Sequence, residues 1–398
     1  MSPWRHHFPL LRARDAVAYL DNAATSQKPQ VVLDAMHSHY REFNANVHRA
    51  THQLGADATE MFERARATVA RHIGNRKPNE VVWTRGTTES INLVANCLVP
   101  SLGPERDIVV TTMEHHSNLV PWHMAAERTG ATVRAVPLTA SGELDMVALA
   151  RNVSDRTCVV AVAHVSNVLG IVNPVRDIAD ITQAHGALLL VDGAQAVPHL
   201  CVDVTGLGCD FYAFSSHKAY GPTGTGVLWG REELLETLGP WQGGGEMIET
   251  VRLDGFTPQA PPYRFEAGTP HIAGAIGLGA ALEFLESLDR EEVLAYESRL
   301  TDLLRTRLDE LGGVQLVGSA TSNIPIVSFN LEGVHHSDIG TILDQQGVAV
   351  RTGHHCAQPL MTSLDLPGCV RASLSLYNDD SDVEKLVKGL GVARDLLL

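Results

Sequence analysis

Two charged side chains stand directly after apolar segments of strand length. Lys218 follows FYAFSS and His217, and Asp192 ends ALLLVD, three residues before Gln195. A lysine at a buried sheet edge needs a partner. A phosphorylated aldehyde cofactor supplies one, because the amine condenses with it to a Schiff base and acts as an acid or base once it is freed. Asp192 would then pair with the pyridine nitrogen of that cofactor, although a helix cap is a simpler role for it.

A second group of polar residues follows the strand-like segments EVVWT and DIVVTTM. Gly86, Thr87 and Thr88 would bring free N–H groups, hydroxyls and the positive end of a helix dipole together, which suits a phosphate. The same segment alone is also an ordinary helix N-cap. His115 could lie flat against a cofactor ring or be a core histidine. Because all these groups follow strand ends, the cofactor interpretation is favoured.

Cys356 is the most informative of the six cysteines. It follows a predicted strand in RTGHHCAQPLM, beside His354 and His355, and is expected in a mobile loop. Neighbouring imidazoles can favour the thiolate, which is the form that attacks sulfur. Adjacent residues rarely point at one metal ion, and His48 and His52 at helical spacing are more typical of a packed or solvated face. We therefore expect no metal site.

Two arginines near this cysteine are candidates for binding a carboxylate. Arg351 precedes the cysteine loop, and Arg371 lies within CVRASLSLY. A guanidinium can hold a carboxylate through two parallel hydrogen bonds. A surface ion pair is the alternative, and it suits Arg371 less because its segment is apolar.

The composition is that of a globular protein without a polyanionic partner. The chain has 398 residues, 44% of them hydrophobic, and Lys plus Arg number 31 against 46 for Asp plus Glu, a net charge of −15. This charge opposes nucleic acid binding. No apolar run is long enough for a membrane helix, and no signal or transit segment is evident, so we expect a soluble, cytoplasmic protein. The cysteines contain no C-x-x-C pair and do not suggest a disulfide scaffold.

The elements that must position these residues alternate between strands and helices. The segments EVVWT, DIVVTTM, ATVRAVPL, TCVVAVAHV, ALLLVD and FYAFSS have strand length, and helical patterns separate them at Thr88–Leu98 and near 117–129, 143–152 and 174–185. Near-continuous apolar strands are typical of a sheet covered on both faces. The sequence therefore predicts a doubly wound, mostly parallel α/β sheet.

A different pattern follows residue 270. Two successive helices are expected in AGAIGLGAALEFLESL and REEVLAYESRLTDLLRTRLDEL, and then the strands NIPIVSFNLEG, GVAVRTG and CVRASLSLY alternate with helices at about 337–346 and 381–397. This pattern favours a smaller α+β domain. We predict a large cofactor-binding domain at 21–290 and a small domain at 1–20 and 291–398 that carries the cysteine loop.

Several motifs in this order resemble the pyridoxal-5′-phosphate (PLP) dependent cysteine desulfurases and selenocysteine lyases of aminotransferase class V, especially the Suf-type and Csd-type group. The motifs are YLDNAATSQKP, NVHRATH, WTRGTTESINLVA, EHHSNLVPW, VSNVLG, VDGAQAV, SSHKAYGPTGTGVLWG, EAGTP and RTGHHCAQPLM. The resemblance covers nearly the whole chain and implies fold type I of the PLP-dependent transferases, the aspartate aminotransferase-like fold. The short RTGHHC loop resembles the Suf/Csd group more than the Isc/Nif group.

The resemblance also implies roles for individual residues. Lys218 would form the Schiff base with PLP, and Cys356 would accept the sulfur. The residues implied at the cofactor are Asp192 on the pyridine nitrogen, Gln195 on the ring hydroxyl, His115 on the ring, and Thr87, Thr88, Ser215 and His217 on the phosphate, with Thr269 from the other subunit of a homodimer. Those implied at the substrate are Asn167, Arg371, Arg351, His48 and Ala23.

Two positions depart from some relatives. Ser216 stands where relatives often have glycine. We expect the fold to tolerate a serine at this position. Ser337 stands where relatives served by a zinc-containing scaffold protein carry histidine, so the resemblance implies a SufE-type or CsdE-type sulfur acceptor.

The expected reaction converts L-cysteine to L-alanine and leaves a persulfide on Cys356, which passes to an acceptor protein, for instance for iron–sulfur cluster assembly. Selenocysteine lyase or cysteine sulfinate desulfinase activity would use the same cofactor chemistry and depend less on Cys356. A non-catalytic scaffold subunit of a sulfur-assembly complex is an alternative of another class, but the intact set of Lys218, Asp192 and Cys356 argues against it.

Overall fold

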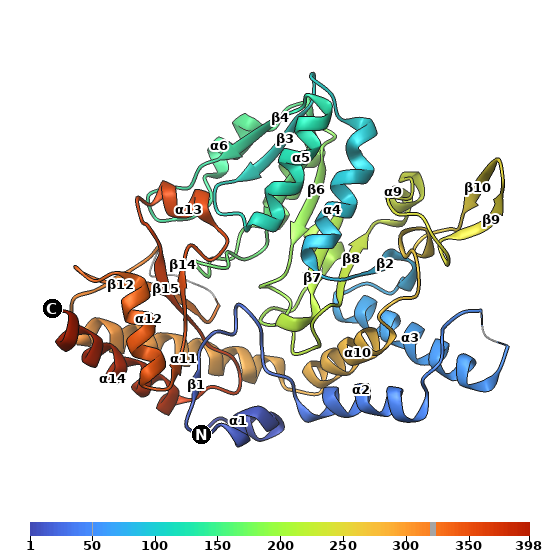
Figure 1. Cartoon of the computed structure of the whole chain (residues 1–398). Coiled ribbons are helices and arrows are strands. Elements are labelled where there is room, and N and C mark those ends of the chain that lie inside the picture. The colour runs from blue at the N-terminus through green and yellow to red at the C-terminus, as the bar shows by residue number, and fades with distance from the viewer. Residues whose placement is uncertain (50, 319–323) are drawn as a thin grey trace.

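The computed structural model describes residues 1–49, 51–318 and 324–398 (Figure 1). Residue 50 of the NVHRATH motif and residue 323, the first of the predicted strand at 323–333, lie outside the described residues. Within these described ranges the strands form two main sheets, one of seven strands and one of four, and two strand pairs lie outside them.

The larger sheet has the strand order β2-β8-β7-β6-β5-β3-β4. Its strands are β2 (Val81–Thr84), β3 (Asp107–Thr111), β4 (Thr132–Val136), β5 (Thr157–Ala163), β6 (Leu188–Asp192), β7 (Phe211–Ser215) and β8 (Gly226–Gly230). β8 pairs antiparallel with both of its neighbours, and the other pairs are parallel. The prediction of a mostly parallel sheet is confirmed.

Helices cover both faces of this sheet, as a doubly wound fold requires. Alternate residues of β5 belong to different hydrophobic clusters: Val160 and Val162 pack with α3 (Gln53–His72), α7 (Val175–Ala184) and α10 (Ile272–Glu286), whereas Val159 and Ala161 pack with α4 (Thr87–Leu98) and α5 (Val120–Thr129). The helices that accompany the sheet are α2 (Gln30–Glu42), α3 (Gln53–His72), α4 (Thr87–Leu98), α5 (Val120–Thr129), α6 (Met146–Asn152), α7 (Val175–Ala184), α8 (Val204–Leu207), α9 (Glu232–Thr237) and α10 (Ile272–Glu286). Because both faces are buried, the strands need apolar residues at every position.

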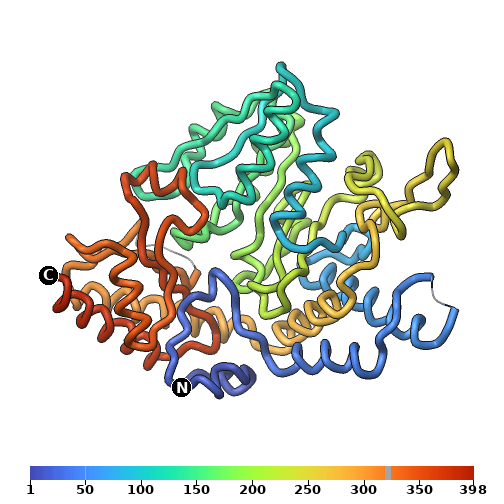
Figure 2. The backbone as a smooth tube through the Cα atoms, viewed as in Figure 1, coloured from blue at the N-terminus to red at the C-terminus, as the bar shows by residue number. Residues whose placement is uncertain are grey.

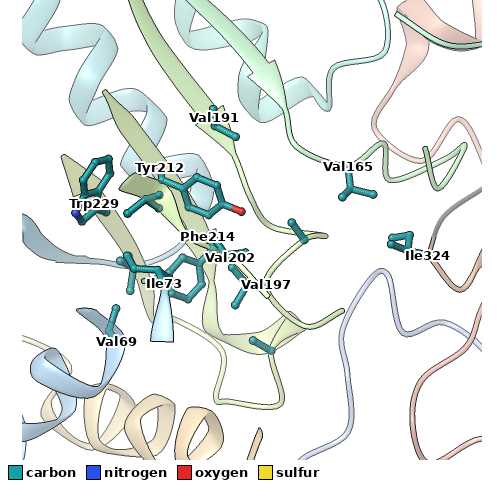
Figure 3. Packing of buried hydrophobic residues seen from close by; sticks show 14 of the residues in the cluster. Val69, Ile73, Val165, Val191, Val197, Val202, Tyr212, Phe214, Trp229 and Ile324 are labelled. Atoms are coloured by element: carbon teal, nitrogen blue, oxygen red, sulfur yellow. The ribbon is translucent and has the colours of Figure 1, made fainter. Parts of the chain in front are cut away.

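Aromatic side chains fill the core beside α3. Figure 3 shows Tyr212 and Phe214 of β7 and Trp229 of β8 near Val69 and Ile73. Tyr212 lies so close to the chain after β6 that a Cβ added to Gly193 would be 2.1 Å from its ring. Only glycine fits at that position, directly after Asp192.

The smaller sheet is antiparallel, with the order β11-β12-β15-β14. Its strands are β11 (Val314–Leu316), β12 (Ile326–Leu331), β14 (Arg351–Gly353) and β15 (Cys369–Ser373), and its helices are α11 (Arg290–Leu311), α12 (His336–Gln345), α13 (Gln358–Ser363) and α14 (Asp380–Leu397). The apolar faces of α11, α12 and α14 share one hydrophobic cluster with β12 and β15. This arrangement agrees with the predicted α+β pattern.

The N-terminal segment lies against the C-terminal third of the chain (Figure 2). It holds α1 (Pro9–Ala13) and β1 (Ala18–Tyr19), and β1 pairs parallel with β13 (Val348–Ala349). GVAVRTG therefore forms two short strands, β13 and β14, instead of one. A hairpin of β9 (Ile248–Arg252) and β10 (Gly255–Pro258), which the sequence analysis did not predict, projects from the body (Figure 1). The domain boundaries at 20/21 and 290/291 stay a prediction.

Candidate active site

A cavity of about 250 Å³ lies where the carboxyl ends of the central parallel strands meet the smaller sheet. Its walls are built by Ala23, Ala24, Thr87, Thr88, His115, Ser117, Ala163, Val165, Asn167, Asp192, Ala194, Gln195, Ser215, His217, Lys218, Arg351, His355, Cys356 and Arg371. Functional groups were expected at the carboxyl ends of these strands. All of the predicted cofactor and substrate residues except His48 and Thr269 line this one cavity.

Lys218 and Asp192 form the charged centre of the cavity. Burial lowers the pKa of Lys218 to about 8, and the negative charge of Asp192 partly opposes this shift. Burial raises the pKa of Asp192, and the nearby lysine opposes that shift in turn. Asp192 is 7% exposed, and its Oδ1 accepts a hydrogen bond from the Ala194 N–H at 2.9 Å. Lys218 can therefore lose its proton more easily than an ordinary lysine, as a nucleophilic amine must.

His115 is held in one tautomer. It caps the short 3₁₀ turn His116–Asn118, where its Nδ1 accepts a hydrogen bond from the Ser117 N–H at 3.1 Å. Burial, followed by Lys218, lowers the pKa of His115 to about 3. The ring is thus neutral with its proton on Nε2.

The first turn of α4 and the end of β7 form a cradle of hydroxyls and amides. The Thr87 N–H donates to Ser215 Oγ at 2.8 Å, and the two side-chain hydroxyls are also 2.8 Å apart. Gly86, with φ of +155°, precedes the helix. A Cβ on Gly226 would lie 2.4 Å from the Gly86 Cα, so glycine is required at 226 for β8 to pass this closely, whereas the positive φ favours glycine at 86.

The cavity wall beside this cradle contains further predicted residues. The Thr88 hydroxyl is 2.6 Å from the hydroxyl of Ser117, which joins the cradle to the His115 turn. Burial, with Lys218 as the next cause, lowers the pKa of His217 to about 4, so the imidazole is neutral. Gln195 donates from Nε2 to the Ala23 carbonyl at 2.8 Å and so fixes the wall beside Asp192.

Cys356 follows β14 and precedes α13, as the sequence analysis expected of a loop after a strand. It is partly exposed, and both His355 and Cys356 have left-handed backbones with φ of +53° and +56°. The Cys356 carbonyl accepts from the His116 N–H at 2.7 Å, and its N–H donates to His354 Nδ1 at 3.1 Å. These bonds hold the thiol at the cavity that Lys218 lines.

The two predicted arginines lie directly opposite each other in the β14–β15 pair. Arg371 is 2% exposed and donates from NH1 to the Asn167 carbonyl at 2.8 Å. Asp21 forms longer ion pairs with both arginines, at 3.4 Å to Arg371 and 3.6 Å to Arg351. The Asn167 side chain donates to the His355 carbonyl at 2.8 Å, so the arginines and the cysteine loop are connected.

His48 does not line the cavity of its own chain, contrary to the expectation. Its Nε2 is 2.9 Å from Oε1 of Glu63 on α3, and its Nδ1 is 3.9 Å from Glu246 Oε2. Thr269, which was expected to act on the other subunit of a dimer, lies in a second cavity with Trp83.

Several residues at or beside the cavity were not predicted from the sequence. Ser117 was quoted within EHHSNLVPW but given no role, although its amide and hydroxyl bind His115 and Thr88. Asp21 and Glu114 also went unassigned, and only their partners in the folded chain reveal them. Within the described ranges, no group of three or more potential metal ligands is present, and no helix is long and apolar enough to span a membrane.

The cavity fits the parts of pyridoxal phosphate. Amides and hydroxyls at the start of α4 and the end of β7 suit its phosphate, and the buried Asp192 carboxylate suits a protonated pyridine nitrogen. Lys218 supplies the amine that its aldehyde requires. The amine, the acid and the phosphate cradle are thus all present in one cavity.

Comparisons with known proteins agree with this arrangement. The aminotransferase class-V family model matches residues 18–386. A probable cysteine desulfurase of Halalkalibacterium halodurans is 49% identical over 94% of this chain and 92% of its own length. The cysteine desulfurase CsdA of Escherichia coli has a TM-score of 0.93 and 42% identity, over 99% of this chain and 98% of its own. A C-DES mutant with glycine covalently linked to its PLP cofactor has a TM-score of 0.84 and 25% identity, over 98% and 99% of the two chains.

Proposed function

Because the chain belongs to the aminotransferase class-V family, we propose that it is a PLP-dependent cysteine desulfurase that converts L-cysteine to L-alanine and keeps the sulfur as a persulfide. The observation that carries this proposal is the single cavity shared by Lys218, Asp192 and Cys356. An amine, an acid and a thiol are the groups that this reaction needs.

Each of these groups has a role in the proposed reaction. When bound to Lys218, pyridoxal phosphate supplies an electron sink for the bonds of the substrate's Cα and Cβ. The Lys218 amine moves the Cα proton, and the neutral His115 can donate the proton on its Nε2. Arg351 and Arg371 bind the substrate carboxylate.

Sulfur transfer balances without an oxidant. The Cys356 sulfur attacks the substrate sulfur, so that an S–S bond forms while the Cβ–S bond breaks. The Cys356 thiol proton and the electron pair of the broken bond end in L-alanine. The enzyme retains a persulfide at Cys356, whose partial exposure would allow a second thiol to remove the sulfur.

The proposed partners follow from residues outside the cavity. His48 and Thr269 do not reach the cavity of their own chain, which supports a homodimer in which they complete the neighbouring site. The exposed Ser337 at the start of α12 supports a SufE-type or CsdE-type acceptor, with iron–sulfur cluster assembly as the downstream use.

The test measures alanine and persulfide formed from L-cysteine by the holoenzyme, with L-selenocysteine in parallel. Cys356→Ala should form no persulfide and lose L-cysteine turnover, whereas Cys201→Ala, at an exposed cysteine that does not line the cavity, should behave like the wild type. Lys218→Ala should lose the visible absorbance of the Schiff base, and the exposed Lys77→Ala should keep it. Full L-cysteine turnover by Cys356→Ala would contradict the sulfur-acceptor role.

A further inference from the structure

A cross-strand pair of arginines borders the cavity. The antiparallel register of β14 and β15 places Arg351 opposite Arg371. Like charges at directly opposed positions destabilise a sheet, so this pair needs a counter-charge. Asp21 supplies it: the residue follows β1, forms an isolated bridge with Ser373, and directs one carboxylate oxygen towards each arginine.

The contacts of Asp21 leave the arginines incompletely bound. Its two ion pairs measure 3.4 and 3.6 Å, whereas a charge-assisted N–H···O bond is usually about 2.7–2.9 Å long. Arg371 makes one firm bond, from NH1 to Asn167, and its buried Nε has no hydrogen-bond partner among the described residues. Both guanidinium groups line the cavity and retain donors for another carboxylate.

The net charge of Arg351, Arg371 and Asp21 is balanced by one negatively charged ligand group. Two guanidinium groups and one carboxylate sum to +1, which a single bound carboxylate neutralises. Without Asp21 the pair would carry +2 and attract the same ligand more strongly. The internal carboxylate therefore lowers the affinity of the arginines for any external one.

We propose that Asp21 is a specificity-determining positioning residue, an internal counter-carboxylate that limits how tightly the arginine pair binds the carboxylate of an amino acid. The proposal rests on the proposed function, in which substrate and product both carry that group. Its consequence is weak retention of L-alanine, so that the product leaves after the sulfur has been transferred.

The experiment titrates holoenzyme with L-alanine and with L-alaninamide, which lacks the carboxylate, and follows the visible absorbance of the cofactor. Asp21→Asn should lower the Kd for L-alanine about tenfold, as expected for removing a charge a few ångströms from the ligand site. The Kd for L-alaninamide should change less than twofold, and the KM for L-cysteine should fall with the Kd for L-alanine. Asp21→Glu, which keeps the charge, should bind L-alanine within about threefold of the wild type.

A matched control is Asp34→Asn, which removes the same charge from an exposed carboxylate on α2 that accepts a hydrogen bond from Gln30. It should leave both Kd values unchanged. An unchanged or higher Kd for L-alanine in Asp21→Asn, or equal changes for both ligands, would overturn the proposal. Wild-type protein that binds L-alanine but forms none from L-cysteine would instead contradict the proposed function.

Discussion

Glu114 gives a prediction that stability measurements can test. Its carboxyl is completely buried behind the cavity, where it accepts hydrogen bonds from the Thr111 hydroxyl at 2.5 Å, the Asn118 amide at 2.6 Å and the Ala163 N–H at 3.0 Å. It precedes His115 and ties that turn to the end of β5. Replacement by glutamine puts an amide N–H₂ where a carboxylate oxygen accepted a hydrogen bond, so at least one of these donors faces another donor. This should cost about 1–3 kcal/mol in the free energy of unfolding.

The same carboxyl makes stability depend on pH with a defined sign. Burial raises the pKa of Glu114 from 4.5 to about 7. Because the folded-state pKa is higher than that of the unfolded chain, protonation stabilises the fold at low pH, and this contribution is lost as the pH rises through about 7. Between pH 6 and pH 8 the loss from this one group amounts to about 1 kcal/mol in the free energy of unfolding.

Urea unfolding at pH 6 and pH 8 measures this contribution. The stability difference between the two pH values should be about 1 kcal/mol smaller in Glu114→Gln than in the wild type. Glu105→Gln, at an exposed carboxylate, should keep the wild-type difference. Identical pH dependence in the wild type and Glu114→Gln would show that Glu114 does not titrate in this range, and the argument from its burial would be wrong.

Three further substitutions test the packing around the site. Gly226→Ala places a Cβ 2.4 Å from the Gly86 Cα and should weaken PLP binding at least tenfold in a titration of the apoenzyme, because the start of α4 must move. Arg66→Met leaves the buried Glu266 without the cation 2.6 Å away, and should cost about 3–5 kcal/mol in urea unfolding. Ser117→Ala removes a hydroxyl that bonds to the first turn of α4, and should raise the Kd for PLP about 2- to 10-fold in the same titration.

The central sheet could be predicted from the sequence because its strands are buried on both faces. Apolar runs such as TCVVAVAHV have strand length and alternate with helical patterns, and parallel strands bring the residues after their carboxyl ends to one edge. Lys218 and His115 follow β7 and β3, Asp192 is the last residue of β6, and all three line one cavity for this reason. The strand β8 was missed because its five residues, GVLWG, directly follow a glycine-rich loop.

The roles that depend on distant partners could not be predicted in this way. Asp21 bonds to Arg371, 350 residues further along the chain, and no local pattern indicates that pairing. Glu114 differs from an exposed glutamate only through its buried partners, which come from β3, β5 and the 3₁₀ turn. His48 was likewise predicted without knowledge of its partners: its imidazole lies beside the carboxylates of Glu63 and Glu246 and does not line the cavity of its own chain.

The left-handed backbone at His355 and Cys356 limits which stabilising substitutions this protein can accept. Positions 355 and 356 both adopt a conformation that glycine tolerates and other residues adopt only at a cost of about 1 kcal/mol or more. A glycine at either place would relax the chain, and at position 356 it would also remove the thiol, so selection for heat resistance alone favours a variant without the sulfur acceptor. Stabilising libraries for this protein should therefore leave both codons fixed.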